Sequence, residues 1–308
     1  VWNSRALKGI WRPAGTGQVI DLGLQQDSYQ LRYLTSSIAG NYLADGPGAM
    51  SANVSGDTRL QAAYAQDAWL PAADWKAVLG LRAEHWQARN GRTDFSATAG
   101  QSYAARSENF LSPKAALSWQ ATADSVLKAS LGRAVRMPTV AELYGATSTT
   151  NSQYINDPNL KPEKSWTAEL SAESAWGPLQ SRVTFFAETT RDSLYSQTVF
   201  DAAANKNISR VQNIDRMGTT GLEATLGATD WLVKGLDLTA SATYTDSKIK
   251  ANRGFVVTSG DTVGKWQPNI PRWRATALAT WRLDERVSAS LAARYSGRQY
   301  RTLNNADN

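Results

Sequence analysis

The sequence contains no cysteine and only one histidine among its 308 residues. The absence of cysteine excludes disulfide frameworks, thiolate metal sites and cysteine nucleophiles. A hydrolase that uses a Ser-His-Asp triad would have to use His85, and a metal site with two histidines cannot be built. His85 is therefore the obvious candidate base for any enzyme, although a single histidine is usually a hydrogen-bonded polar residue without a ligand role.

Long apolar runs are also missing, although 42% of the residues are hydrophobic. No run of about 18 apolar residues is present, which excludes a membrane protein built from spanning helices. A barrel strand faces lipid with every second residue only and never forms such a run, so a membrane β-barrel remains possible.

Charge of one sign is not concentrated anywhere in the chain. The formal net charge is +6, from 33 basic and 27 acidic residues. The basic residues are dispersed rather than clustered, which argues against the electrostatic footprint of a nucleic-acid-binding protein. No nucleic-acid partner is therefore expected.

Apolar and polar side chains alternate in several segments. In residues 75–83 the odd positions are apolar and the even positions are mostly polar, and the pattern returns at 127–132, 182–188, 236–245 and 273–282. A period of two predicts β-strands with one apolar face. Several segments reach the roughly 9 to 11 residues that a tilted strand needs to cross a bilayer. Their apolar faces are rich in alanine, which suits lipid better than the densely packed interior of a soluble sandwich.

Short and long connections alternate along the chain. Tight turns are predicted at 71–74, 122–124, 177–178 and 284–285, and long polar segments at 35–58, 90–110, 137–163, 197–207 and 250–269. Tryptophans lie near the short turns, where indole rings would form a girdle at the membrane interface. Short periplasmic turns, long outer loops and such a girdle are typical of outer-membrane barrels. The sequence therefore predicts an all-β fold, a transmembrane antiparallel β-barrel.

The middle of the chain carries two motifs separated by a polar loop. Residues 136–145 read RMPTVAELYG, and residues 157–163 read DPNLKPE. This block resembles the R-x-P…ELYG and N-P-x-L-K-P-E segments of TonB-dependent outer-membrane receptors, with Asp157 where asparagine is more common. Further segments resemble that family in order and spacing: 61–69, 79–82, 110–114, Asn213 with 221–223, 268–273 and 295–298.

The resemblance implies a fold and a function. About a dozen strands are expected here, as part of a larger barrel of probably 22 strands. Residues 1–308 would form a single partial barrel domain, because Val1 follows no signal peptide and neither a plug domain nor an aromatic-terminated last strand is found. The protein would lie in the outer membrane of a Gram-negative bacterium, contacting its lipid. It would import a scarce ligand, most often a ferric siderophore, driven by TonB through the missing plug.

No catalytic residue, metal site or cofactor is expected, because this family moves its ligand without covalent chemistry. The alternatives are a receptor for cobalamin, haem or a glycan, a passive porin, a barrel enzyme that uses His85, and a soluble carbohydrate-binding β protein. Haem is disfavoured because no histidine lies between the two motifs, where haem importers of this family tend to carry a ligand. A porin would have a constriction loop and would lack the central block.

Candidate ligand-binding residues are few. Tyr144 and Tyr154 are the possible iron ligands, although Tyr144 lies in the ELYG motif and is better explained as a structural residue. Basic side chains on the polar faces of the predicted strands could attract an anionic chelate or pair with carboxylates of a plug. The predicted lumen-facing residues are Arg82, Arg182, Arg274, Arg282 and Arg294.

Overall fold

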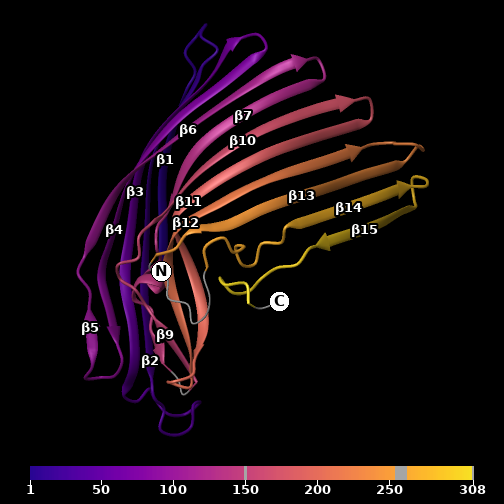
Figure 1. Cartoon of the computed structure of the whole chain (residues 1–308). Coiled ribbons are helices and arrows are strands. Elements are labelled where there is room, and N and C mark those ends of the chain that lie inside the picture. The colour runs from indigo at the N-terminus through magenta and orange to yellow at the C-terminus, as the bar shows by residue number, and fades with distance from the viewer. Residues whose placement is uncertain (149–150, 254–261, 307–308) are drawn as a thin grey trace.

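The computed structural model describes residues 1–148, 151–253 and 262–306 and consists of one large antiparallel sheet (Figure 1). Twelve strands follow one another in the order β1-β2-β3-β4-β6-β7-β10-β11-β12-β13-β14-β15. This confirms the expected dozen. Their bounds are β1 Trp2–Trp11, β2 Val19–Ser36, β3 Met50–Ala72, β4 Trp75–Asp94, β6 Arg106–Thr122, β7 Ser125–Arg136, β10 Glu163–Trp176, β11 Leu179–Asp201, β12 Lys206–Ala228, β13 Leu236–Ala251, β14 Trp273–Arg282 and β15 Ser288–Ser296.

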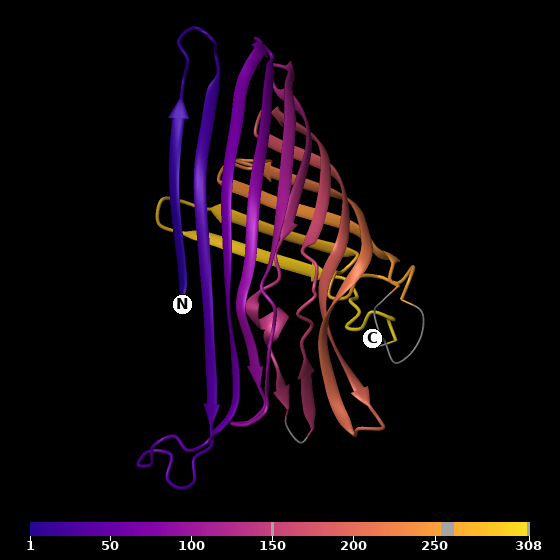
Figure 2. The same cartoon turned by 90° about the vertical axis from the view of Figure 1, so that its left-hand side faces the viewer.

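The sheet is strongly curved and twisted. Figure 1 shows it arching as an open trough, and in Figure 2 β14 and β15 cross behind the steep first strands. Within the described residues, β1 and β15 each pair with one neighbour only, so the barrel is not closed by this part of the chain. No helix in the described residues is long and apolar enough to cross a membrane.

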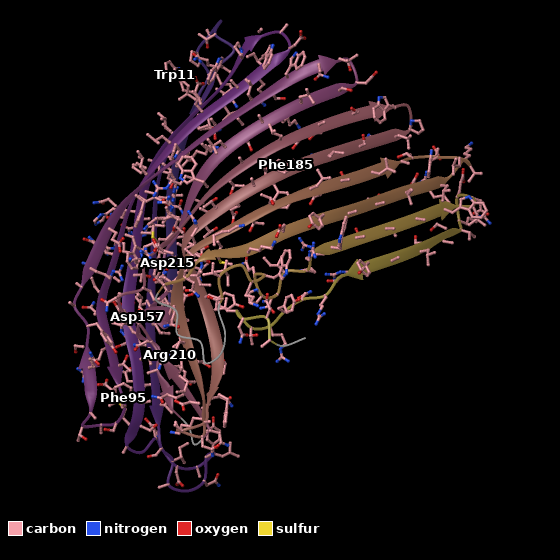
Figure 3. The ribbon with its side chains drawn as sticks, in the orientation of Figure 1. Trp11, Phe95, Asp157, Phe185, Arg210 and Asp215 are labelled. Carbon is pink, nitrogen blue, oxygen red and sulfur yellow. The ribbon has the colours of Figure 1, made fainter. Side chains whose placement is uncertain are left out.

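Several short elements lie at the loop end of the sheet. The strand β5 (Gly100–Ser102) pairs with β4, and β8 (Thr147–Ser148) pairs with β9 (Ser152–Ile155). The strand β9 runs parallel to the outer part of β12, and a short helix, α1, spans Val140–Tyr144. Trp11 lies at the turn end of the sheet and Phe95 at the loop end (Figure 3).

One face of the sheet is apolar and open to its surroundings. Leu79, Leu170 and Leu291 project from it with exposed fractions of 53%, 61% and 76%. Such exposure of large apolar side chains is unfavourable in water and favourable in lipid, so this is the outward face of a membrane barrel. The predicted alternation is confirmed, because the intervening residues form the opposite, polar face.

Tryptophans mark the turn end of the outward face. The rings of Trp75 and Trp119 stack at a centroid distance of 5.6 Å and an interplanar angle of 11°, next to the turns after β3 and β6. Trp176 and Trp281 are also exposed near short turns. These positions fit the predicted interfacial girdle.

The strands extend further than predicted on the loop side. The prediction of a long loop at 197–207 is wrong, because β11 and β12 are each 23 residues long and residues 202–205 form a tight turn between them. The strand β3 already starts at Met50, and β4 continues to Asp94, so the loops expected at 35–58 and 90–110 are shorter. Beyond the bilayer both faces of a strand contact water, and the alternation that reveals strands is lost there.

Candidate functional site: the loop block on the polar face

The chain between β7 and β10 folds back onto the polar face of the sheet. It starts with α1, whose N-cap is Thr139. The Thr139 hydroxyl accepts a hydrogen bond from the Glu142 N–H at 3.2 Å, and the Glu142 carboxylate accepts one from the Thr139 N–H at 2.7 Å. This capping box satisfies two backbone donors and lets a helix of five residues form. Arg136 pairs with the same carboxylate at 2.7 Å, which fixes the helix to the end of β7.

The buried face of α1 forms a core with the polar face of the strands. Val140, Leu143 and Tyr144 are at most 1% exposed and pack against Trp86 and Ala88 of β4. These strand residues have the parity of the polar face, and Leu60 of β3, which is paired with Trp86, packs against the same core. This core therefore lies inside the mouth of the barrel. We call residues 137–163, which include α1, the loop block.

The Tyr144 ring lies where two glycines leave space for it. A Cβ atom at Gly56 would lie 2.7 Å from the ring, and one at Gly91 only 2.4 Å from it. The Tyr103 ring stacks on the Tyr144 ring at 5.1 Å, and the Thr93 hydroxyl donates to the Tyr144 carbonyl at 2.5 Å. The Tyr144 side chain of the ELYG motif therefore fills a socket formed by β3, β4 and the extended segment at Tyr103.

The second motif is held by Arg106 at the start of β6. Its Nη1 donates to the carbonyls of Pro158 and Leu160 at 3.0 and 2.8 Å, and its Nη2 donates to Glu108. The guanidinium lies over the Trp86 ring at 5.3 Å from the centroid. Leu160 is fully buried as a result, and the DPNLKPE segment is fixed to β4 and β6.

The segment that leads into β10 is held by hydrogen bonds to strands β11 and β12. The side-chain amide of Asn213 on β12 accepts from the Lys161 N–H at 2.8 Å and donates to the Lys161 carbonyl at 2.9 Å. A Glu163 oxygen accepts from the Leu194 N–H at 2.9 Å and from the Ser193 hydroxyl at 3.2 Å. The loop block therefore bridges β2–β4 and β11–β12 across the polar face.

The two predicted iron ligands belong to this block. Tyr144 is 1% exposed, and burial raises its pKa. Burial, and then the nearby Glu142 carboxylate, raise the pKa of Tyr154, which packs on the same core. Ferric iron binds the phenolate form, so a raised pKa disfavours coordination. Tyr144 acts as a core residue in this structure, and a ligand role for Tyr154 stays a prediction.

The five predicted basic residues all have the parity of the polar face. Arg82 pairs with Glu84 at 2.8 Å, Arg182 pairs with Glu173 at 2.9 Å, and Arg282 pairs with Asp237 and Asp230. The carboxylates on the barrel wall thus satisfy these three cations. Arg274 and Arg294 have no ion pair with any described residue.

Sequence reasoning missed two of the residues that hold the block, Arg106 and Trp86, and identified Asn213 only as a match to the family. All three come from distant strands, and no local pattern marks them as partners of the two motifs. The capping box of Thr139 and Glu142 was visible as T-x-x-E before an apolar pair, and it would have predicted a helix in this loop. In the described residues, no group of three or more acidic or histidine side chains is arranged to hold a metal ion.

Asp94, at the loop end of β4, allows the local stability of this region to be tested through its dependence on pH. Arg92 and then Asn53 hydrogen-bond to its carboxylate, at 2.9 Å each, and lower its pKa from 3.8. A lowered pKa means that the folded state favours the ionised form, so the stabilisation is complete well above pH 3.8 and is lost as pH falls through the lowered value. We expect amide protection in β4 and β5 to be constant from neutral pH to about pH 5 and to fall below pH 3.8.

Hydrogen exchange measured across this pH range would test the expectation. The Asp94→Asn variant should show weaker protection that no longer changes with pH in this window. A parent protein whose β4–β5 protection is already lost at pH 6 would contradict it.

Comparison with known families connects this geometry to a protein class. The family model for the TonB dependent receptor-like β-barrel matches residues 5–308. The chain belongs to this family. The resemblance seen in the central motifs is thereby confirmed, and the loop block is the structural form of those motifs in this TonB-dependent receptor barrel.

Solved structures agree on the fold. The chain is similar to the ferric enterobactin receptor PfeA (G324V mutant) of Pseudomonas aeruginosa, with 19% identity, a TM-score of 0.69, and coverage of 97% of this chain and 41% of that one. It is similar to the unliganded ferric citrate transporter FecA, with 16% identity, a TM-score of 0.72, and coverage of 99% and 43%. The copper transporter OprC matches with 18% identity, a TM-score of 0.68, and coverage of 96% and 44%. A comparison with curated protein sequences found no match. The chain spans less than half the length of these receptors.

Proposed function

We propose that this protein imports a ferric siderophore, or another anionic metal chelate, across the outer membrane of a Gram-negative bacterium with energy supplied through TonB. The observation that carries the proposal is the family match over residues 5–308 together with a receptor-type barrel wall. The similar solved proteins are described as handling ferric enterobactin, ferric citrate and copper, which supports a metal-containing ligand. No step of such transport needs a catalytic residue, so an enzymatic function is not proposed.

The share of those receptors that the chain covers supports one further proposal. Residues 1–308 would be part of a single larger barrel domain, and contact with TonB would be made through a plug outside these residues. The barrel wall then supplies the conduit, and the loop block forms part of the rim of its mouth.

Ligand uptake in iron-starved cells tests the function directly. The intact protein should import one member of a panel of ferric siderophores, haem and cobalamin, and import should stop in cells without functional TonB. Leakage of many small solutes that does not depend on TonB would instead identify a passive porin.

Arg274 and Arg294 offer a test at residue level. Because they face the lumen without a carboxylate partner among the described residues, their charges are free to attract an anionic chelate. We expect the double variant Arg274→Gln/Arg294→Gln to lower the association rate by about tenfold at low ionic strength and by much less above roughly 0.5 M salt. Stopped-flow binding measures this rate.

The matched control removes the same charge elsewhere. Arg12 and Arg286 lie in exposed turns at the other end of the strands. The Arg12→Gln/Arg286→Gln variant should bind the chelate at the rate of the parent. Equal rates in both double variants would show that lumen charge does not attract the ligand.

A further inference from the structure

Two neighbouring connections at the turn end of the sheet expose large apolar side chains. Residues 229–235, between β12 and β13, read TDWLVKG, and residues 283–287, between β14 and β15, read LDERV. Their exposed apolar residues, which we call the apolar rim, are Leu232, Val233, Leu283 and Val287, with exposed fractions of 78%, 50%, 52% and 51%.

The other short connections at this end of the sheet differ in composition. They contain no leucine, isoleucine, valine or aromatic residue, and they comprise residues 12–18, 73–74, 123–124 and 177–178. The apolar rim is therefore a local feature of the last four strands, β12 to β15.

The turn that carries Leu232 is strained. Leu232 has a positive φ of 67°, and the Val233 N–H donates to the Trp231 carbonyl at 2.8 Å. This is a γ-turn with a positive central φ, which is the rare and strained form. Glycine adopts such a φ freely, whereas a bulky side chain does so at a cost. An exposed leucine here neither relaxes the turn nor fills a core, which indicates a contact outside the chain.

The two turns are fixed to each other. The Arg282 N–H donates to the Gly235 carbonyl at 2.8 Å, and the Arg282 side chain pairs with Asp230 at 3.3 Å and with Asp237. A Cβ atom at Gly235 would lie 2.3 Å from the Arg282 carbonyl oxygen, so glycine permits this close approach. Figure 1 shows the turns as neighbours at the right-hand end of the sheet. The apolar rim is thus one surface patch.

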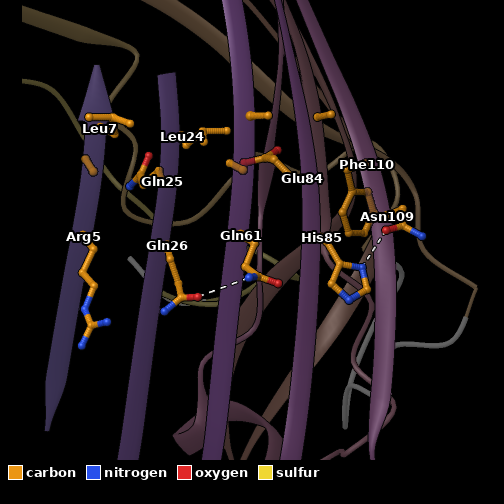
Figure 4. A pocket seen from close by; sticks show the side chains of 14 residues that line it. Arg5, Leu7, Leu24, Gln25, Gln26, Gln61, Glu84, His85, Asn109 and Phe110 are labelled. Carbon is orange, nitrogen blue, oxygen red and sulfur yellow. Dashed lines mark hydrogen bonds between the residues drawn. The ribbon is translucent and has the colours of Figure 1, made fainter. Parts of the chain in front are cut away.

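The height of the lipid-facing band can be measured on β4. At its loop side, His85 lies in a polar row with Gln61 and Asn109, beside leucine and alanine side chains (Figure 4). At its turn side, Trp75 stacks on Trp119. From Trp75 to His85 the strand rises about 33 Å, or about 25 Å along the membrane normal at a tilt of about 40°. This is the usual height of the apolar band, so the tryptophans mark its periplasmic limit.

The apolar rim lies beyond this limit. Trp281 of β14, which is paired with Leu236, marks the limit on the last strands. Leu283 follows Trp281 with the same outward parity, about 5 Å further along the membrane normal at the same tilt. Leu232 and Val233 lie beyond Leu236 in the neighbouring turn. The apolar outward surface therefore continues past the tryptophan girdle at β12 to β15.

Hydrogen bonds within the turns satisfy several of their polar groups. An Asp230 oxygen accepts from the Gly235 N–H at 2.7 Å. An Asp284 oxygen accepts from the N–H groups of Arg286 and Val287 at 2.7 and 2.8 Å. Backbone donors that are already paired cost less to remove from water. Such turns can enter the headgroup region of a bilayer.

We propose that the apolar rim is embedded in the headgroup region of the periplasmic leaflet, where it contacts the glycerol and upper acyl groups of phospholipids. Continuity with the lipid-facing surface through Leu236 and Trp281 favours lipid over a protein partner. The leaflet would then reach about 5 Å further toward the periplasm at β12 to β15 than at β3 to β6. The inference rests on the proposed outer-membrane function, since only a barrel in a membrane brings these turns to lipid.

A fluorophore that is sensitive to its environment tests this contact in the intact protein, reconstituted in phosphatidylcholine vesicles. Residues 1–308 contain no cysteine, so a cysteine introduced there reports one position. We expect a label at Leu232→Cys to emit at shorter wavelength than in water and to be quenched by lipids with a spin label near the glycerol. Its quenching by aqueous iodide should be several-fold weaker than at the matched control Ala123→Cys, in the exposed turn between β6 and β7.

Three results would overturn the proposal. Equal iodide quenching at the two positions would show that the apolar rim is in water. Shielding of Leu232→Cys in native outer membranes but not in vesicles would identify a protein partner. Shielding that disappears as the protein is diluted with lipid would identify a second copy of the chain. If Leu232→Cys disturbs the strained turn, Leu283→Cys replaces it with the same expected result.

A parallel measurement separates this inference from the function on which it rests. Outer-membrane insertion and TonB-dependent uptake are measured for the parent in iron-starved cells. Failure of both in the parent would refute the proposed function. Normal uptake by the parent, together with iodide-accessible labels at Leu232→Cys and Leu283→Cys, would refute only the contact of the apolar rim with lipid.

Discussion

Replacing Tyr144 with alanine is expected to destabilise the loop block by about 3–5 kcal/mol, which is the usual cost of removing a buried aromatic side chain. The ring is 1% exposed, stacks on Tyr103, and fills the space left by Gly56 and Gly91. Its removal leaves a cavity that the rigid strands β3 and β4 cannot close. Hydrogen exchange of residues 138–145 and 158–163 measures the loss, and the barrel strands themselves should keep their protection.

The Tyr144→Phe variant distinguishes a structural role from iron coordination. Phenylalanine keeps the ring in its socket and removes the only group that could bind iron. We expect this variant to retain the stability of the loop block to within about 1 kcal/mol and to import ligand at the parental rate. Loss of uptake with an intact loop block would show that Tyr144 contacts the ligand after all.

Replacing Arg106 with alanine is expected to release the second motif, at a cost of about 2–3 kcal/mol. Two carbonyls, those of Pro158 and Leu160, would lose a charged donor, and Trp86 would lose the cation above its ring. The guanidinium is partly exposed, so solvent takes over part of each interaction and a cost above this range is not expected. Limited proteolysis of the segment 151–163 would report the release.

Arg106→Lys provides the matched variant. One ammonium group keeps the charge, but it cannot hold the fork geometry that serves two carbonyls and Glu108 together. Its effect should therefore be about half that of the alanine variant. Proteolysis of both variants at the parental rate would mean that burial of Leu160 alone holds the segment.

Sequence pattern predicts this fold well only where lipid and water contact opposite faces of one strand. In the middle of the sheet, Leu79 and Leu81 alternate with Gly80 and Arg82, and the strand was predicted with the correct apolar and polar faces. Beyond Arg191 the signal fails, because Asp192 adopts a positive φ of 55° and both faces of the strand then contact water. Residues 197–207, at the loop ends of β11 and β12, were therefore expected to be loop.

The loop block shows a different limit. Its two motifs were recognised by resemblance, but their partners were not, because Trp86 and Arg106 are brought to them only by the register of β4 and β6. A polar composition made the segment 137–163 look like an open loop. Four apolar residues within it, Val140, Leu143, Tyr144 and Leu160, form a core that composition averages hide.

The exposed apolar face has a consequence for how such chains change over time. A side chain that contacts lipid has no fixed neighbour whose shape it must match, so at positions such as Leu170 and Phe185 apolar character is sufficient. A soluble core demands complementary volumes and accepts far fewer replacements. Substitution at the lipid-facing positions of the strands therefore costs little stability as long as the new residue is apolar. A TM-score of 0.72 at only 16% identity is expected of a barrel wall whose sequence is constrained mainly to alternate apolar and polar residues.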